Sequence, residues 1–215
     1  MLNVVSHTNP EDKYYNFIKD WIIPIIPEGN NKIMDLGCAA GQMGRLLKEL
    51  KKASIVIGVE MYAPAAELAK QYYDVVHVVD ADFLNLDYKE YFDFVICGDI
   101  LEHMRDPWSM VAKIYGWLKV GGSLIISIPN VRYFGLLKDL ILKGKFEYED
   151  SGILDKTHLR FFTRNSIVEL VEGAHFKVVS QNMLISGKKK NALNFFSIGV
   201  FEEFLGSQIK IVAIK

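Results

Sequence analysis

The feature that most constrains the fold is the segment KIMDLGCAAG at residues 32–41, where a short apolar run ends in a turn of glycines and alanines. A second apolar run, IVIGVE, follows it and ends at Glu60. A turn of small residues between a strand and a helix lets the polar groups of a ligand approach the backbone. A carboxylate about 20 residues further along is placed to accept the hydroxyl hydrogens of a ribose. Together the two runs predict a nucleotide-binding α/β domain.

Strand-like runs alternate with helix-like stretches over most of the chain. The runs lie at 32–37, 54–60, 75–80, 92–99 and 121–129, and helical patterns lie between them at 41–52, 62–73 and 106–119. Asp106 is the expected N-cap of the last of these helices, with Pro107 at its first position. Strands that are apolar on nearly every residue are typical of a parallel sheet covered on both faces. We therefore expect a Rossmann-like, doubly wound α/β fold.

The two ends of the chain add elements to this repeat. Helical spacing over residues 10–27 predicts an N-terminal helix that Pro24 and Pro27 stop. Near the C-terminus a helix is expected at 163–174, with Thr163 as its N-cap, followed by two strands at 175–185 and 207–215 that can pair antiparallel. The lysines at 188–190 are expected in the loop between these strands.

Size and charge favour a single soluble domain over residues 1–215. The formal net charge of the 215-residue chain is −1, which does not indicate a nucleic-acid-binding surface. The two cysteines, Cys38 and Cys97, lie in apolar segments and are expected to be small buried residues of a protein in a reducing compartment. The N-terminus lacks a signal-peptide pattern, and no window is apolar enough for a membrane span, so we expect a cytoplasmic protein.

A third acidic residue ends the strand-like run at 75–80. Asp80 could accept a hydrogen bond from an exocyclic amine such as that of adenine, while the backbone N–H of Ala81 or Asp82 faces a ring nitrogen. Small or acidic residues at three successive strand ends form a joint pattern, and it indicates an adenine nucleoside as the ligand.

These motifs resemble class I S-adenosylmethionine-dependent methyltransferases, and the resemblance covers residues 32–185. DLGCAAG at 35–41 is similar to the family's DxGxGxG motif, and Glu60, Asp80 and FDFVICGDILEHM at 92–104 follow in the family's order. The resemblance implies a seven-stranded sheet in the order 3-2-1-4-5-7-6 with the last strand antiparallel. It also implies S-adenosylmethionine as the cofactor and transfer of its methyl group as the activity.

In that family the backbone at residues 37–39 faces the methionine part of the cofactor, and Asp35 orients the loop. Glu60 holds the ribose, Met61 packs on the adenine, Asp80 and Ala81 read the adenine edge, and the backbone of Cys97 lies near the amino acid end. The cofactor-binding residues implied in this chain are Asp35, Gly37, Cys38, Ala39, Gly41, Glu60, Met61, Asp80, Ala81, Asp82 and Cys97. Ala39 replaces a more usual glycine, which requires a negative φ at that position.

The acceptor side is expected in a cap inserted after the fifth strand, at residues 130–163. A related bacterial group shares the DKTHLRFFT segment at 155–163 and acts in polysaccharide or secondary-metabolite pathways, which suggests a small-molecule acceptor such as a sugar. A hydroxyl acceptor needs a base, and His103 and His158 are the candidates. Asp155, Thr157 and Arg160 are the expected substrate-binding residues. Residues 1–30, with their aromatic stripe, are a candidate lid over the cofactor.

Two other functions share part of this pattern: an NAD-dependent oxidoreductase of Rossmann fold, and a cofactor-binding protein without catalysis. Tyr115 and Lys119 match the YxxxK pair of short-chain dehydrogenases but precede the fifth strand rather than follow it, and the turn lacks a true GxGxxG. Histidines and carboxylates show no familiar ligand spacing, so no metal is expected. The lysine-punctuated segment 133–146 could lie on a membrane surface, although a cap helix explains it as well.

Overall fold

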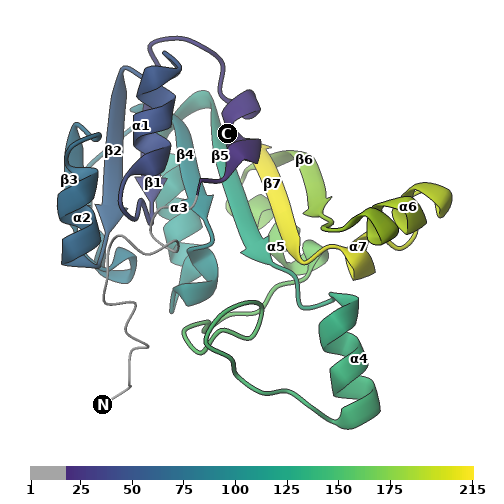
Figure 1. The fold of residues 1–215 in the computed structure, drawn as a ribbon. Coiled ribbons are helices and arrows are strands. Elements are labelled where there is room, and N and C mark those ends of the chain that lie inside the picture. The colour runs from purple at the N-terminus through teal and green to yellow at the C-terminus, as the bar shows by residue number, and fades with distance from the viewer. Residues whose placement is uncertain (1–17) are drawn as a thin grey trace.

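The computed structural model describes residues 18–215, and its centre is one seven-stranded sheet in the order β3-β2-β1-β4-β5-β7-β6 (Figure 1). β7 runs antiparallel to both of its neighbours, whereas β1 to β5 pair in parallel. This confirms the predicted order and the single reversed strand. The strands are β1 (Lys32–Leu36), β2 (Ile55–Glu60), β3 (Val75–Val78), β4 (Phe92–Gly98), β5 (Leu118–Pro129), β6 (Lys177–Leu184) and β7 (Gln208–Ile214).

Helices cover both faces of the sheet. The α-helices are α1 (Gln42–Glu49), α2 (Ala63–Ala69), α3 (Pro107–Trp117), α4 (Phe134–Lys143), α5 (Arg164–Gly173), α6 (Lys188–Phe196) and α7 (Glu202–Leu205). Short 3-10 helices are η1 (Asp20–Ile25), η2 (Ala81–Phe83) and η3 (Leu101–His103). None of the helices in the described part of the chain is long and apolar enough to cross a membrane.

Alternate residues of the central strands supply two separate cores. Ile33, Ile96 and Ile125 pack with η1 and α1 on one face. Their neighbours in sequence, Met34 and Val95, face the larger core under α3 and α5. Because successive side chains of a strand point to opposite faces, a run that is apolar at every position can bury both. The doubly wound arrangement follows directly from this composition.

The predicted helix boundaries are right where capping residues define them. The Asp106 carboxylate accepts from the backbone N–H of Ser109 at 3.0 Å, as expected of the α3 N-cap. Thr163 begins α5 with a capping box completed by Ser166. These side chains satisfy amide groups that have no partner within the helix, so the local sequence is enough to place the helix start.

Two predictions about the ends of the chain are wrong. Lys188–Lys190 do not form a loop but begin helix α6, since a strand-to-strand connection of this length has room for its own helical turns. Pro24 lies inside η1, one residue before its end, rather than stopping the helix before it, because the φ that the proline ring imposes is one that a 3-10 helix also adopts. Tyr14, Tyr15 and Phe17 of the candidate lid lie outside the described residues.

The segment 130–163 is an excursion from the sheet whose two ends meet. Asn130 and Phe162 form a parallel bridge, and the N–H of Val131 donates to the Phe162 carbonyl at 3.1 Å. Between them lie α4 and a long irregular stretch, which Figure 1 shows beyond the edge at which β4 and β5 end. The predicted cap therefore lies over the carboxyl ends of the parallel strands.

Candidate active site

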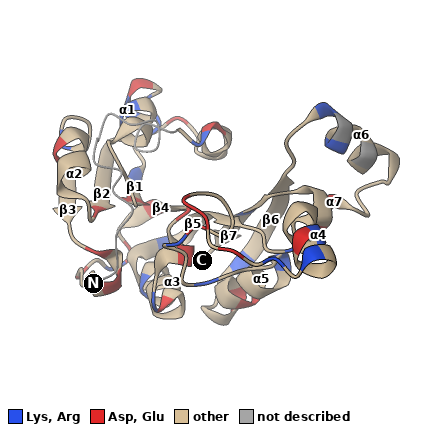
Figure 2. Ribbon diagram, turned by 60° about the horizontal axis from the view of Figure 1, so that its bottom comes forward, with Lys and Arg blue, Asp and Glu red and all other residues tan. Residues whose placement is uncertain are grey.

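The carboxyl ends of the parallel strands bring the predicted cofactor residues to one edge of the sheet. Leu36 is paired with Val59 of β2 and with Cys97 of β4, and Glu60 is paired with Val78 of β3. Figure 2 brings this edge forward and shows acidic residues at several of the strand ends. Open α/β sheets bind their ligands outside the carboxyl ends of their strands.

The loop after β1 uses its backbone amides within the protein. The N–H groups of Gly37 and Cys38 both donate to the Val59 carbonyl, at 2.8 and 3.0 Å, and the N–H of Ala39 donates to Glu60 at 3.0 Å. These three amides therefore do not point toward an open site, as a phosphate cradle requires. The arrangement is unsuited to a pyrophosphate and disfavours a dinucleotide.

Ala39 has a φ of 48°, so the expectation of a negative φ at this position is wrong. The tight turn is imposed by the hydrogen bonds that its neighbours make to β2, and they hold the alanine in the left-handed region despite its methyl group. Gly41 is also left-handed, at φ 88°, and a Cβ there would lie 2.7 Å from the Cα of Ala69. The missing side chain of Gly41 thus allows α2 to pack closely here, and the expected part of Gly41 in cofactor binding stays a prediction.

Glu60 connects the two strand ends. One carboxylate oxygen accepts from the Ala39 N–H, and the other accepts from the Tyr62 N–H at 2.8 Å. Burial raises the pKa of Glu60, and these backbone donors oppose the rise. Each oxygen retains a lone pair for a further donor. Met61, the next residue, is 68% exposed and free to cover an aromatic base.

Asp35, near the end of β1, is buried and accepts a hydrogen bond from a tyrosine. The Tyr73 hydroxyl donates to Asp35 at 2.5 Å and accepts from the backbone N–H of Gly44 in α1 at 3.1 Å. Desolvation by burial raises the pKa of Asp35 from 3.8 to about 6, against the opposing effects of the Tyr73 hydrogen bond and Lys19. Asp35 is therefore linked through Tyr73 to the first turn of α1, and its expected role in orienting the loop stays a prediction.

The two acidic residues after β3 have different roles. Asp80 caps η2 by accepting from the Asp82 N–H at 3.0 Å. Asp82 accepts from the backbone N–H of Arg105 at 3.0 and 3.1 Å and so ties η2 to the segment after β4. Ala81 is buried between them. The hydrogen bond from Arg105 to the Asp82 carboxylate was not expected from the sequence, which predicted only a contact of Asp82 with the adenine.

The end of β4 carries a polar network that sequence reasoning missed. Asp99, left-handed at φ 53°, accepts from the Ser127 hydroxyl at 2.8 Å and from Gln208 of β7, and it lies 3.3 Å from the Lys19 ammonium. A non-glycine residue with positive φ at a strand end often marks a functional site. Cys97, two residues earlier, has a fully buried side chain and can reach a ligand through its backbone alone.

On the acceptor side, a chain of hydrogen bonds from Asp155 and Thr157 of the cap fixes the His103 ring. The Thr157 hydroxyl donates to Asp155 at 2.6 Å and lies 3.0 Å from Nδ1 of His103, and the Thr157 carbonyl lies 3.2 Å from the same nitrogen. Since that carbonyl only accepts, Nδ1 carries the hydrogen and the lone pair resides on Nε2. Burial and the neighbouring His158 lower the pKa of His103, which keeps the imidazole neutral.

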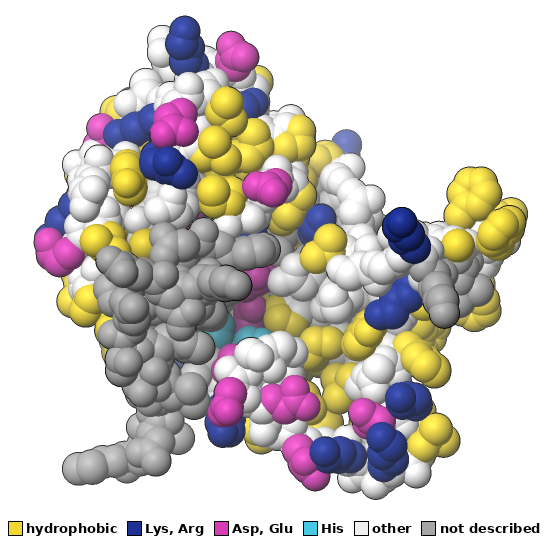
Figure 3. Space-filling model, in the orientation of Figure 1, with side chains coloured by type: hydrophobic (Ala, Val, Ile, Leu, Met, Phe, Trp, Pro, Cys, Tyr) yellow, Lys and Arg dark blue, Asp and Glu magenta, His cyan; other side chains and the backbone are white. Residues whose placement is uncertain are grey.

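His158 lies beside His103, with ring centroids 4.7 Å apart, and its Nδ1 is 2.9 Å from the Ile153 carbonyl. The cap is fixed to η3 here, because the N–H groups of Leu159 and Arg160 both donate to the Glu102 carbonyl, at 2.8 and 2.9 Å. Figure 3 shows histidine side chains next to acidic ones at the bottom of a hollow between the cap and the body of the molecule. The two candidate bases, 55 positions apart in sequence, therefore share one site.

Arg160 points to a different place from the histidines. Its guanidinium donates to the Arg105 carbonyl and lies over the Trp108 ring, 5.7 Å from the centroid. It lines a cavity of about 270 Å³ together with Phe161 and Glu169. The observed contacts of Arg160 fix the cap to the start of α3. A role of Arg160 in binding the substrate stays a prediction.

A family model described as "Methyltransferase domain" matches residues 11–181. The chain belongs to this methyltransferase family. Among curated relatives, a ubiquinone biosynthesis O-methyltransferase of Albidiferax ferrireducens is 28% identical over 123 residues, 52% of this chain and 46% of that protein. One from Glaesserella parasuis is 31% identical over 109 residues, 46% of this chain and 45% of that protein. The matched region thus spans about half the length of these relatives.

Solved structures of other methyltransferases share the fold. A SAM-dependent methyltransferase from Archaeoglobus fulgidus superposes with a TM-score of 0.68 at 18% identity, covering 94% of this chain and 97% of that one. An S-adenosylmethionine-dependent methyltransferase from Mesorhizobium loti gives 0.67 at 17% identity, with 91% and 96% covered. Family and fold together support S-adenosylmethionine as the cofactor of this methyltransferase domain.

The residues at the strand ends fit this cofactor better than a dinucleotide. Glu60 has free lone pairs for ribose hydroxyls, Met61 is exposed beside it, and the loop amides are occupied by Val59 and Glu60. Lys119, half of the apparent dehydrogenase pair, forms an ion pair with Asp93 at 2.7 Å, at the opposite edge of the sheet. Lys119 therefore lies away from the strand ends that carry Glu60 and His103.

Proposed function

We propose that this methyltransferase domain transfers a methyl group from S-adenosylmethionine to a hydroxyl of a small-molecule acceptor. The observation that carries the proposal is the His103 ring after β4, whose Nδ1 is held by Thr157, so that the lone pair is left on Nε2, and whose pKa is lowered by burial. A hydroxyl becomes a good nucleophile only as its proton is removed, and a positioned imidazole performs that task near neutral pH.

When bound, S-adenosylmethionine supplies an electrophilic methyl group on a sulfonium. The tasks left to the protein are to align the acceptor, exclude water and take one proton. Glu60 and Met61 orient the nucleoside end, while the cap positions the acceptor above the strand ends. His103 Nε2 receives the acceptor proton, and Asp155 stabilises the resulting imidazolium through Thr157.

The acceptor class is inferred from two sources. The curated relatives are named as O-methyltransferases of ubiquinone biosynthesis, which favours oxygen as the atom methylated. The cap offers polar groups and aromatic rings close together, since Phe146 and Phe161 lie with their centroids 6.0 Å apart and His158 lies 6.5 Å from Phe161. Such a surface suits a hydroxylated ring, from a phenol or from a sugar of a polysaccharide precursor or secondary metabolite.

The proposed lid over the cofactor at residues 1–30 remains part of this proposal. Trp21 is the described member of its aromatic stripe, and it packs against β7, with Lys210 5.0 Å from its ring centroid. Any closure over the cofactor would therefore come from residues that precede Trp21. Deleting residues 1–17 should weaken S-adenosylmethionine binding, and unchanged affinity would refute the lid.

Calorimetry with S-adenosylmethionine and with NAD, followed by transfer of labelled methyl to a panel of phenols and sugars, tests the function. We expect the protein to bind S-adenosylmethionine but not NAD, and to transfer the labelled methyl group to a hydroxyl acceptor. His103→Asn should lower turnover by about 100- to 10,000-fold with unchanged cofactor affinity. His175→Asn, at an exposed histidine outside the site, is the matched control. Full turnover of His103→Asn would exclude this histidine as the base, and binding of NAD alone would exclude the cofactor.

A further inference from the structure

Two helices at one side of the molecule carry apolar side chains that the fold leaves uncovered. Half of the large hydrophobic side chains exposed in the described part of the chain come from residues 134–146 and 188–201, which we call the outer surface. None of the ten residues of α4 is buried. Exposed apolar patches of this extent mark interaction sites. Six of these side chains are at least 72% exposed: Ile141, Leu142, Phe195, Phe196, Ile198 and Val200.

Contacts between α4, α6 and α7 join the outer surface into one unit. The Lys190 ammonium of α6 donates to the hydroxyl of Tyr133, the N-cap of α4, and lies 4.6 Å from the centroid of that ring. One residue earlier, Arg132 forms an ion pair with Glu203 of α7 and lies 4.7 Å from the centroid of the Phe204 ring. Figures 1 and 2 both place α4 and α6 on the same side of the molecule, outside the sheet.

The outer surface is basic as well as apolar. Its only acidic residue among the described side chains is Asp139, which pairs with Lys143 at 2.8 Å. Glu147, just beyond α4, pairs with Lys145 at 2.9 Å. Figure 3 shows hydrophobic and basic side chains together over α6 and α4, at the right of the molecule. The lysines with described side chains are Lys138, Lys143, Lys145, Lys188 and Lys190, in a chain whose formal net charge is −1.

The most exposed part of the outer surface is a turn whose backbone is satisfied by its own hydrogen bonds. Ile198 and Gly199 are both left-handed, at φ 53° and 78°. The N–H of Ile198 donates to the Phe195 carbonyl at 3.1 Å, and that of Gly199 donates to the Asn194 carbonyl at 2.9 Å, which closes the end of α6. A segment enters an apolar medium at low cost only when its backbone groups have partners. The turn can therefore place Phe195 and Ile198 in such a medium.

We propose that the outer surface binds the headgroup region of an anionic lipid bilayer. Its aromatic and aliphatic side chains enter the boundary between headgroups and acyl chains, and its amines reach the lipid phosphates. Lysine suits this position because its stem lies along apolar surface while its charge stays in water. A second copy of the chain fits less well. In a two-fold symmetric dimer the surface would meet itself, so that the lysines of one copy would face those of the other.

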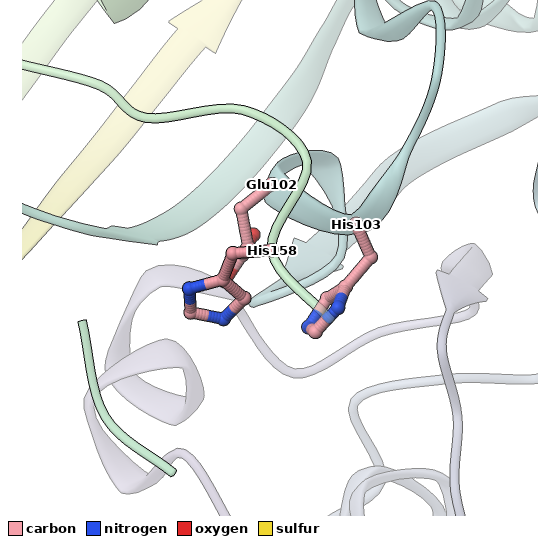
Figure 4. A group of neighbouring side chains, drawn as sticks. All are labelled: Glu102, His103 and His158. Carbon is pink, nitrogen blue, oxygen red and sulfur yellow. The ribbon is translucent and has the colours of Figure 1, made fainter. Parts of the chain in front are cut away.

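The outer surface shares no residue with the acceptor end of the active site. That end is marked by Glu102, His103 and His158, of which one carboxylate oxygen and one nitrogen from each ring lie within 4.8 Å of one another (Figure 4). Glu102 is 1% exposed, and neither of its carboxylate oxygens accepts a hydrogen bond from residues 18–215. Binding to lipid can therefore be changed without touching these groups, and the inference does not depend on the proposed function.

Vesicle sedimentation tests the proposal with the full-length protein. Vesicles of phosphatidylcholine, with or without about 30% phosphatidylglycerol, are pelleted and the bound fraction is measured. We expect binding to the anionic vesicles, and this binding should fall as NaCl is raised. Phe195→Ser should lower the partition coefficient by about 10-fold or more. Lys188→Gln should lower it by about 5-fold, which corresponds to about 1 kcal/mol per lysine near the surface.

The matched controls change residues outside the outer surface. Val120→Ser alters a side chain that is 79% exposed, as Phe195 is, and Lys89→Gln removes an exposed lysine. Both should bind vesicles like the wild type. Melting temperatures measured by circular dichroism should agree among all four variants and the wild type, because each substitution lies at the surface.

The proposal is overturned if the wild type does not pellet with anionic vesicles, or if Phe195→Ser and Lys188→Gln bind them as the wild type does. Sedimentation velocity without lipid tests the other occupant. A dimer that Phe195→Ser converts to a monomer, in a protein that does not bind vesicles, would assign this surface to a second copy of the chain. Vesicle binding by a protein that transfers no methyl group would contradict only the proposed function.

Discussion

The buried carboxyl of Asp35 should make stability depend on pH in an unusual direction. Burial raises its pKa from 3.8 to about 6, so the folded protein holds a proton that the unfolded chain releases between these values. The stabilising effect of that proton is fully present below pH 3.8 and is lost as pH rises through 6. At about 1.36 kcal/mol per pH unit, the loss amounts to about 3 kcal/mol.

The assay is urea unfolding followed by circular dichroism between pH 4 and pH 8, for the wild type and for Asp35→Asn. Asparagine keeps an oxygen to accept from Tyr73 but cannot ionise. Relative to Asp35→Asn, the wild type should therefore lose about 3 kcal/mol over this range, most of it between pH 4 and 6. Asp87→Asn removes the charge of an exposed carboxyl and serves as the control for the effect of one lost surface charge on the free energy of unfolding.

Removing the donor tests the same pair from the other side. Tyr73→Phe deprives the Asp35 carboxylate of its hydroxyl partner and should cost about 1.5 to 3 kcal/mol at pH 8. The cost should be smaller in the Asp35→Asn background, where no charge remains to be stabilised. A difference between wild type and Asp35→Asn that stays constant from pH 4 to pH 8 would refute the reasoning.

Three further predictions concern the loop and the strand ends. Ala39→Gly removes the strain of a left-handed alanine, about 1 to 2 kcal/mol, although the greater freedom of glycine in the unfolded chain offsets part of this gain. In urea unfolding, the free energy of unfolding should therefore rise by less than about 1.5 kcal/mol. A lower free energy of unfolding would contradict this prediction. Gly41→Ala places a Cβ 2.7 Å from Ala69 at a φ of 88° and should lower the melting temperature, whereas Gly116→Ala, with open space around it, should not. Glu60→Gln should weaken S-adenosylmethionine binding by about 10- to 150-fold in calorimetry, since a charged acceptor is lost, and equal affinity would remove Glu60 from the cofactor site.

Much of the fold could be predicted because the decisive patterns are local. Apolar runs of strand length, the Asp106 and Thr163 caps, and the small-residue turn at 37–41 each act within a few residues. The helix at 188–196 was missed because three lysines indicate a solvated surface and do not distinguish a loop from a helix. The φ of Ala39 was missed because hydrogen bonds to β2, far along the chain, impose it.

The candidate site divides in the same way. Glu60, Asp35 and the two histidines could be named from residue type and from their positions after apolar runs. Asp99 and Lys19 could not, since their contact depends on the N-terminal segment crossing the end of β4. The convergence of Glu102 with His158 was equally hidden, because it needs the cap to fold back and bond to the Glu102 carbonyl.

By itself, the sequence determined the alternation of strands and helices, the family and the edge of the sheet at which a nucleoside would bind. These follow from hydrophobic periodicity and from side chains that act on their own neighbourhood. Only the tertiary structure decided which loop amides are occupied, how Asp155 reaches His103 through Thr157, and that two histidines and a buried carboxylate meet. Those features depend on contacts between distant segments, whose approach is set by packing of the whole domain rather than by any local pattern.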